Sequence, residues 1–213
     1  MPESNPRTIS VTGTGRVSVE PDVADLRLGV TITALTAQKA RAANATAMTG
    51  VIGALKALDI APRDIQTANL SLSPTYDYSG DANPPRLAGY TLTNTVAVLL
   101  RDIGKVGQAI DDSLEAGATT LDSLTFRVLD PSMAEQQARE VAVGDARAKA
   151  EVLAAAGGVS IGGVAAISEQ GAPTPFPVLH KEMALMAARD AATPVEAGTN
   201  EVAISVAVTY LIG

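Results

Sequence analysis

Apolar and polar residues alternate along much of this chain. From residue 24 to residue 34 every even position is apolar and every odd position is polar or glycine, which predicts a strand with one buried face. Glycines at positions 13 and 15 suggest a turn or a bulge that joins two shorter strands. The other strands that we predict are 9–13, 16–19, the two arms of a hairpin at 65–78 and 90–100, 121–129, 163–168 and 202–212.

Apolar residues at spacings of three and four predict three helices. We expect them near residues 36–58, 102–117 and 130–157, with Thr36, Asp102 and Asp130 as N-caps. Gly117 and Gly157 would end the second and third. In the third helix we place four residues on the buried side, namely Val141, Ala148, Val152 and Ala155. Three i,i+4 ion pairs are expected on its solvated side, at 135–139, 145–149 and 147–151.

These elements predict an α+β fold. We expect a layered sandwich in which three helices cover one face of a mixed, largely antiparallel sheet, while the other face is wet or covered by a partner. Residues 1–6 would form an N-terminal tail, and residues 7–213 a single domain with a long, proline-rich loop at 171–200.

Composition and charge narrow the classes of function. Apolar residues make up 46% of the chain and charged residues 18%, which is typical of a globular protein. The net charge of −7, without any cluster of lysine and arginine, argues against nucleic-acid binding. No run of 18 apolar residues is present, so we predict no transmembrane segment.

Few side chains here are suited to catalysis. The chain has no cysteine, no tryptophan and one histidine, so we expect neither disulfides nor thiolate chemistry, and no cofactor or metal. His180 lies in a proline-rich stretch without a companion histidine. The Gly13-x-Gly15 pair lacks the third glycine and the helix of a dinucleotide-binding loop. We therefore predict no catalytic residue.

Two alternatives remain open for the polar side chains. A pair of carboxylates with separated pKa values would suit a hydrolase or a small-ligand site. Tyr76 and Tyr78, beside the 79–85 loop, would suit a ligand pocket or a contact for a protein partner. The carboxylates in question are Asp22, Asp25, Asp77, Asp111, Asp112, Asp122 and Asp130.

The 171–200 segment is the strongest candidate for a self-association surface. Residues 178–189 could form a short amphipathic helix, and exposed apolar side chains of this kind often mark an interface. The alternative is a loop that folds back over its own core. The apolar side chains that we single out here are Phe176, Leu179, Met183 and Met186.

Several stretches together resemble the SIMPL family, also called domain of unknown function 541. The resemblance begins at residues 9–22 and runs to about Ile212. Its other matching stretches are 64–67, 72–76, Gly89-Tyr90 with Asn94, Arg101-Asp102, 107–117, Phe126 and 145–151.

The resemblance implies an α+β fold built from β-α-β-β units. It also implies a bacterial periplasmic or envelope protein, a link to oxidative-stress tolerance, and large oligomers in some members. No catalytic residues are established for the family. We therefore expect a non-enzymatic scaffold that forms a homo-oligomer; the alternatives are a small-ligand binder or hydrolase, and an adaptor for a protein partner. The location would be periplasmic if a leader was removed, and cytoplasmic if Met1 is the native start.

Overall fold

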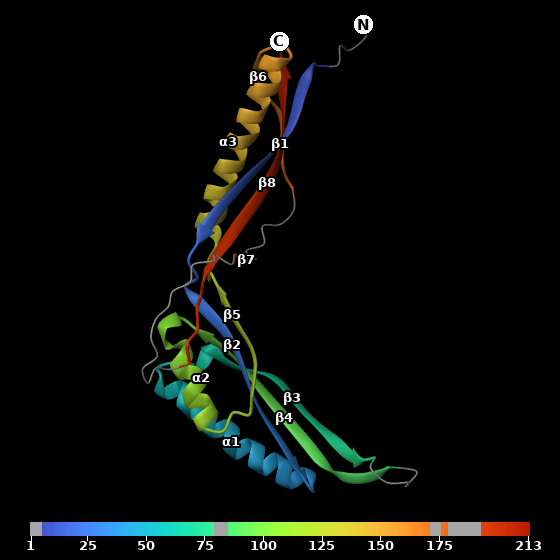
Figure 1. Ribbon diagram of the computed structural model, residues 1–213, viewed down its shortest axis with the longest axis vertical. Helices are drawn as coiled ribbons and strands as arrows, with labels where there is room; N and C mark the ends of the chain where they lie inside the picture. Colours follow the sequence, from blue (N-terminus) through green and yellow to red (C-terminus); the bar gives the residue numbers. More distant parts are fainter. Residues whose placement is uncertain (1–5, 79–84, 171–175, 179–192) are drawn as a thin grey trace. The chain divides into compact units, whose positions relative to one another are not determined.

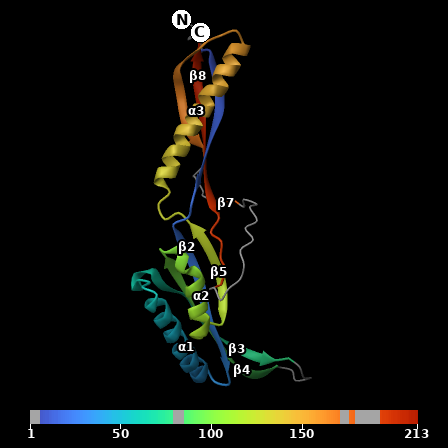
Figure 2. The same ribbon diagram turned by 60° about the vertical axis from the view of Figure 1, so that its left-hand side comes forward.

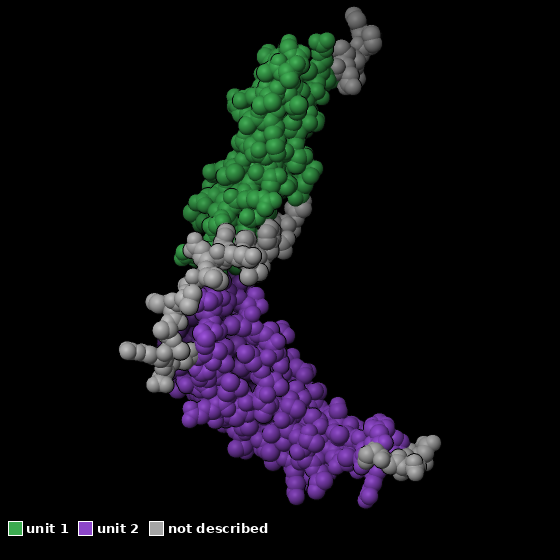
Figure 3. Space-filling view, in the orientation of Figure 1, with its two compact units in different colours: residues 1–21, 128–182, 198–213 green, residues 22–127, 183–197 purple. Residues whose placement is uncertain are grey.

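The computed structural model describes residues 6–78, 85–170, 176–178 and 193–213. These residues form two compact units, each with its own sheet and core (Figures 1 and 3). Unit 2 comprises residues 22–127 and 183–197, and unit 1 comprises residues 1–21, 128–182 and 198–213. The predicted α+β class is confirmed: the described residues contain three α-helices, and every strand pairing is antiparallel.

Unit 2 is a four-stranded sheet in the order β3-β4-β2-β5, with two helices on one face (Figure 1). The chain order β2-α1-β3-β4 is the β-α-β-β unit that the resemblance implies. The elements are β2 (Val23–Ala34), α1 (Ala37–Ala57), the 3₁₀ turn η1 (Pro62–Asp64), β3 (Ile65–Asp77), β4 (Arg86–Leu100), the 3₁₀ turn η2 (Ile103–Lys105), α2 (Val106–Glu115) and β5 (Thr120–Arg127).

The core of unit 2 follows the predicted alternation. Leu26, Leu28 and Val30 of β2 are fully buried, and they pack with the Met48–Val51–Leu55 stripe of α1. Thr36 caps α1 as predicted, because its side chain accepts a hydrogen bond from the Lys39 amide. Asp102 likewise accepts from the Gly104 amide ahead of α2.

Unit 1 packs one long helix against a sheet in the order β1-β8-β6, with β7 also paired to β8 (Figure 2). The first and last strands of the chain are neighbours, so that Thr8 pairs with Leu211 and Val19 with Asn200. The elements are β1 (Thr8–Val19), α3 (Ser132–Ala156), β6 (Ile161–Gln170), β7 (Phe176–Val178) and β8 (Thr199–Ile212).

The buried face predicted for the third helix is wrong. Val141 and Val152 are 50% and 69% exposed, and Ala148 and Ala155 are exposed as well. The residues that face the sheet are instead six alanines at every fourth position, namely Ala134, Ala138, Ala142, Ala146, Ala150 and Ala154. The three predicted i,i+4 ion pairs are present.

The predicted turn or bulge at Gly13-Thr14-Gly15 is also wrong, because β1 runs through it without a register shift. A Cβ atom at Gly13 would collide with the Ala142 carbonyl and lie 2.6 Å from the Ala146 amide nitrogen. A Cβ atom at Gly15 would collide with the Ala138 carbonyl and lie 2.7 Å from the Ala142 nitrogen. Glycine stands at these two positions because the backbone of α3 is in contact with the strand there.

Candidate functional site

The sheet face of unit 2 opposite the helices is lined by hydroxyl groups. Thr33 of β2, Thr91 of β4 and Thr75 of β3 form a chain of side-chain hydrogen bonds across three strands, with lengths of 2.7 and 3.0 Å. Thr31 and Thr93 form a parallel bond of 3.0 Å. These are the polar positions of the predicted alternation, and their side chains hold the strands in register on the solvent side.

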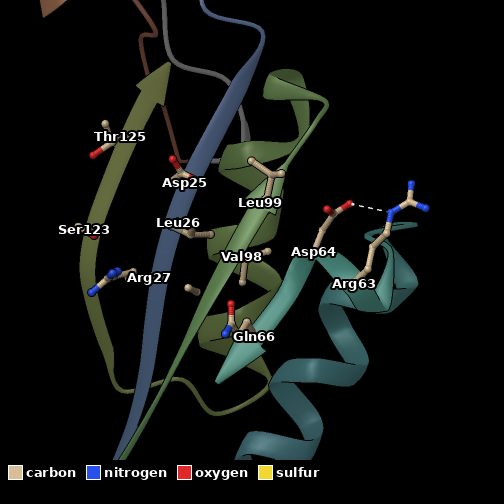
Figure 4. Close-up of a pocket in the computed structure, with 11 residues that line it drawn as sticks. Asp25, Leu26, Arg27, Arg63, Asp64, Gln66, Val98, Leu99, Ser123 and Thr125 are labelled. Carbon is tan, nitrogen blue, oxygen red and sulfur yellow. Dashed lines mark ion pairs between the residues drawn. The ribbon is translucent and has the colours of Figure 1, made fainter. Parts of the chain in front are cut away.

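A cleft of about 680 Å³ lies at one end of this face (Figure 4). It is crossed by a row of directly paired residues, one from each strand: Ser123, Arg27, Ala97 and Gln66. The remaining residues lining the cleft are Asp25, Leu26, Arg63, Asp64, Val98, Leu99 and Thr125.

Both carboxylates in the cleft are held by arginines. Arg101 donates two hydrogen bonds to Asp64, at 2.9 and 3.0 Å, and these bonds hold the pKa of Asp64 below its ordinary value. Arg127 donates to both oxygens of Asp25. Arg27 also lines the cleft and forms no ion pair with any described residue. Its positive charge is therefore not neutralised, whereas the two carboxylates are each paired with another arginine.

Hydrogen bonds shift the pKa of several described carboxyls away from what a general acid needs. Four of them have a shifted pKa, and in each case hydrogen bonds lower it. Asp111 accepts from Thr193, and Asp130 accepts from Ser132 at the start of α3. A carboxyl that donates a proton near neutral pH needs the opposite shift. Within the described part of the chain, no group of three His, Asp or Glu side chains could hold a metal ion.

The open edge of β3 carries exposed apolar side chains. Leu70 is 65% exposed and Leu72 is 48% exposed, because α1 packs over β2 and β4 and leaves the same face of β3 uncovered. Beside them lies a groove of about 400 Å³ that Asn44 of α1 and Leu92 of β4 also line. From residue 65 to residue 76 the strand has no charged side chain. Uncharged, exposed strand edges readily pair with another chain.

The edge of β1 differs, because an ion pair on α3 covers it. Asp145 accepts a hydrogen bond of 2.8 Å from the Thr14 amide, and Lys149 donates one of 3.0 Å to the Thr12 carbonyl. Asp145 and Lys149 are themselves 2.6 Å apart. These two side chains occupy the backbone groups that a further strand would need.

The other three strand edges are short, irregular or charged. β7 has only three residues. β6 has two register shifts within ten residues and carries Glu169. β5 is eight residues long, contains Asp122 and Arg127, and has a register shift against β2. Among the edges that the structure describes, β3 therefore has the longest uncharged stretch.

The predicted contact residues are only partly described. Tyr76 and Tyr78 are 44% and 75% exposed, at the end of β3 and just beyond it. Phe176 lies in β7, where its backbone pairs with Glu201. Leu179, Met183 and Met186 lie outside the described residues, as do His180, most of the proposed 178–189 helix and much of the 79–85 loop. Of the 171–200 segment, Thr193 bonds to Asp111 of α2, and Val195 packs on the unit 2 core.

The sequence analysis missed the cleft and the cover on the β1 edge, although the resembling stretches contain some of their residues. Asp64 and Arg101 come from two such stretches and form one ion pair. Gly13 and Gly15 come from the first stretch and contact the helix whose 145–151 stretch supplies Asp145 and Lys149. No single stretch reveals these contacts. They become visible only when the fold brings the stretches together.

The class that these features define is an α+β protein built of antiparallel sheets, each backed by helices. The chain belongs to the SIMPL family, described as "Protein of unknown function (DUF541)", which it matches over residues 9–210 and thus in both units. It is 37% identical to the "26 kDa periplasmic immunogenic protein" of Brucella melitensis, over 98% of this chain and 86% of that one.

More distant relatives share the name "Uncharacterized protein YggE". The chain is 32% identical to the Escherichia coli K12 protein, over 68% of this chain and 58% of the relative. It is also 32% identical to the Edwardsiella ictaluri protein, over 73% of this chain and 65% of the relative. Among the residues that the structure describes, no helix is both long and apolar enough to cross a membrane.

Proposed function

We propose that this protein is a non-enzymatic scaffold of the bacterial cell envelope that works by assembling with copies of itself. The observation that carries the proposal is the β3 edge, which is long and uncharged and exposes Leu70 and Leu72 beside an open groove. The printed name of the Brucella relative supports a periplasmic location. Asp25 and Asp64 are engaged in ion pairs, and Asp111 and Asp130 accept hydrogen bonds, which supports a structural role rather than catalysis.

Self-association is the property to measure. Light scattering coupled to size-exclusion chromatography, at tens of micromolar protein, is expected to give a mass that is a multiple of 21.7 kDa. Leu70→Lys should lower this mass, because a lysine on a strand edge disfavours pairing with another strand. The substitution should leave the fold intact, since Leu70 is 65% exposed.

Leu35→Lys is the matched control. Leu35 is 76% exposed and lies between β2 and α1, outside β3, so the assembly should persist while the charge changes equally. A wild-type protein that stays monomeric under these conditions would overturn the proposed function. If both variants lowered the mass of the assembly equally, the β3 edge would no longer be part of the proposed function.

A further inference from the structure

We propose that two copies pair their β3 strands antiparallel across a two-fold axis at Ser71, so that two unit 2 sheets become one continuous sheet. This rests on the proposed function and specifies its contact. A two-fold axis makes a surface bind its own copy, so a strand at such an axis must be complementary to itself when reversed. β3 lies on the border of its sheet and is open to such pairing (Figure 1).

The register follows from the irregularities of β3. The strand has a register shift between Thr67 and Asn69, and Pro74 lacks the amide that a ladder needs. The regular segment between them is Asn69–Ser73, and Ser71 is its centre. Reversal about Ser71 places Leu70 opposite Leu72 of the partner subunit and Asn69 opposite Ser73 of the partner subunit.

This register joins like surfaces on both faces of the sheet. Leu70 and Leu72 share the helix side of β3, where they pair with Asn94 and Leu92 of β4, so the four leucines of two copies would cover one another. Asn69, Ser71 and Ser73 lie on the hydroxyl-lined face and would extend it. A slip by one residue would set leucines against polar residues, because it turns every side chain to the other face.

Charge argues for a second copy as the occupant. Each chain carries a net charge of −7, so two copies repel wherever their charged surfaces approach. The β3 stretch from 65 to 76 has no charged residue, so the paired strands themselves bring no like charges together, and the nearest charge in the adjoining groove is that of Arg41 on α1. The other described edges carry charged residues, are covered by an ion pair or, in β7, are only three residues long, which directs association to β3.

A single introduced cysteine tests the register, because the native chain has none. Residues directly opposite in antiparallel strands have Cα atoms about 4.5 to 5.5 Å apart, within the range that a disulfide spans. Ser71→Cys should therefore give a covalent dimer on mild oxidation, visible on a non-reducing gel and lost on adding reductant. Under reducing conditions its elution volume should match that of the wild type.

Ser73→Cys is the matched control on the same strand and face. It should give little covalent dimer, because each Ser73 faces Asn69 of the partner subunit, whereas the double variant Asn69→Cys with Ser73→Cys should crosslink well. An assembled wild type in which Ser71→Cys fails to crosslink, or crosslinks no better than Ser73→Cys, would overturn this inference and leave the proposed function standing. A monomeric wild type would overturn both the inference and the proposed function. A strand from a different protein would then be the partner to test for at the β3 edge.

Discussion

At the scale of single residues, two glycines determine how closely α3 approaches β1. A strand pattern interrupted by Gly13 and Gly15 is compatible with a turn or with close approach of another backbone. The neighbouring residues alone favour a turn or a bulge. The structure shows that residues more than a hundred positions away decide the matter, since the carbonyls of Ala138 and Ala142 fill the space that side chains would need.

Substitution of Gly13 by alanine is expected to destabilise the protein by about 3 kcal/mol, since overpacking against backbone cannot be relieved by a side-chain rotation. Gly163→Ala is the control, because a Cβ atom there meets nothing within 4 Å. That variant should be neutral or slightly more stable than the wild type. Urea unfolding followed by circular dichroism measures both. Equal free energies of unfolding for the two variants would contradict the close contact.

At the scale of elements, the sequence predicted strands better than it predicted helix faces. Alternation in β2 identified its buried side, and large aliphatic residues of β4 and β8 likewise fill the cores. In α3 the same reasoning placed Val141 and Val152 inside, since hydrophobicity alone ranks valine above alanine. The close approach of α3 to β1 reverses this order, because only methyl-sized side chains fit between two backbones that touch.

The ion pair that covers the edge of β1 should make stability depend on pH. The side chain of Lys149 and the Thr14 amide lower the pKa of Asp145 in the folded protein. A lowered folded pKa contributes stability above the unfolded carboxyl pKa of about 3.9, and this contribution is lost as the pH falls toward the folded value. Asp145→Asn should therefore unfold more easily than the wild type at pH 7, with a smaller difference near pH 3.

Glu151→Gln is the control for this measurement. It removes an ion pair of the same i,i+4 type, with Arg147, on an exposed part of α3. Its effect should be a few tenths of a kcal/mol at most, about what such helix pairs contribute. If Asp145→Asn were no more destabilising than Glu151→Gln at neutral pH, the hydrogen bonds to β1 would have no role in stability.

At the scale of the whole molecule, the sequence indicated the class and the family but not the partners of its outer strands. The pairing of β1 with β8 joins residues about two hundred positions apart, and no local pattern encodes it. The same holds for the cleft, since Asp64 and Arg101 are recognisable as partners only after β3 and β4 are aligned. The exposure of the β3 leucines likewise depends on the packing of α1, which covers β2 and β4 but not β3.

Net charge gives an expectation for the assembled protein. If copies associate through an uncharged strand, added salt should strengthen association, because it screens the repulsion between chains of charge −7. Raising the salt from about 0.1 to about 1 M shortens the screening length from about 10 to about 3 Å. Sedimentation equilibrium should show tighter self-association over this range. Dissociation by salt would instead indicate an interface held by opposite charges.

The close packing of α3 on β1 also limits which substitutions this protein can accept. Positions 13 and 15 admit no side chain at all, and Ala138, Ala142 and Ala146 lie directly against them while the two backbones remain in contact. A larger side chain on one of these two elements would require the other element to move away. Tolerated substitutions are therefore expected on the outward surface of α3. The buried alanines and the two glycines should change together or not at all.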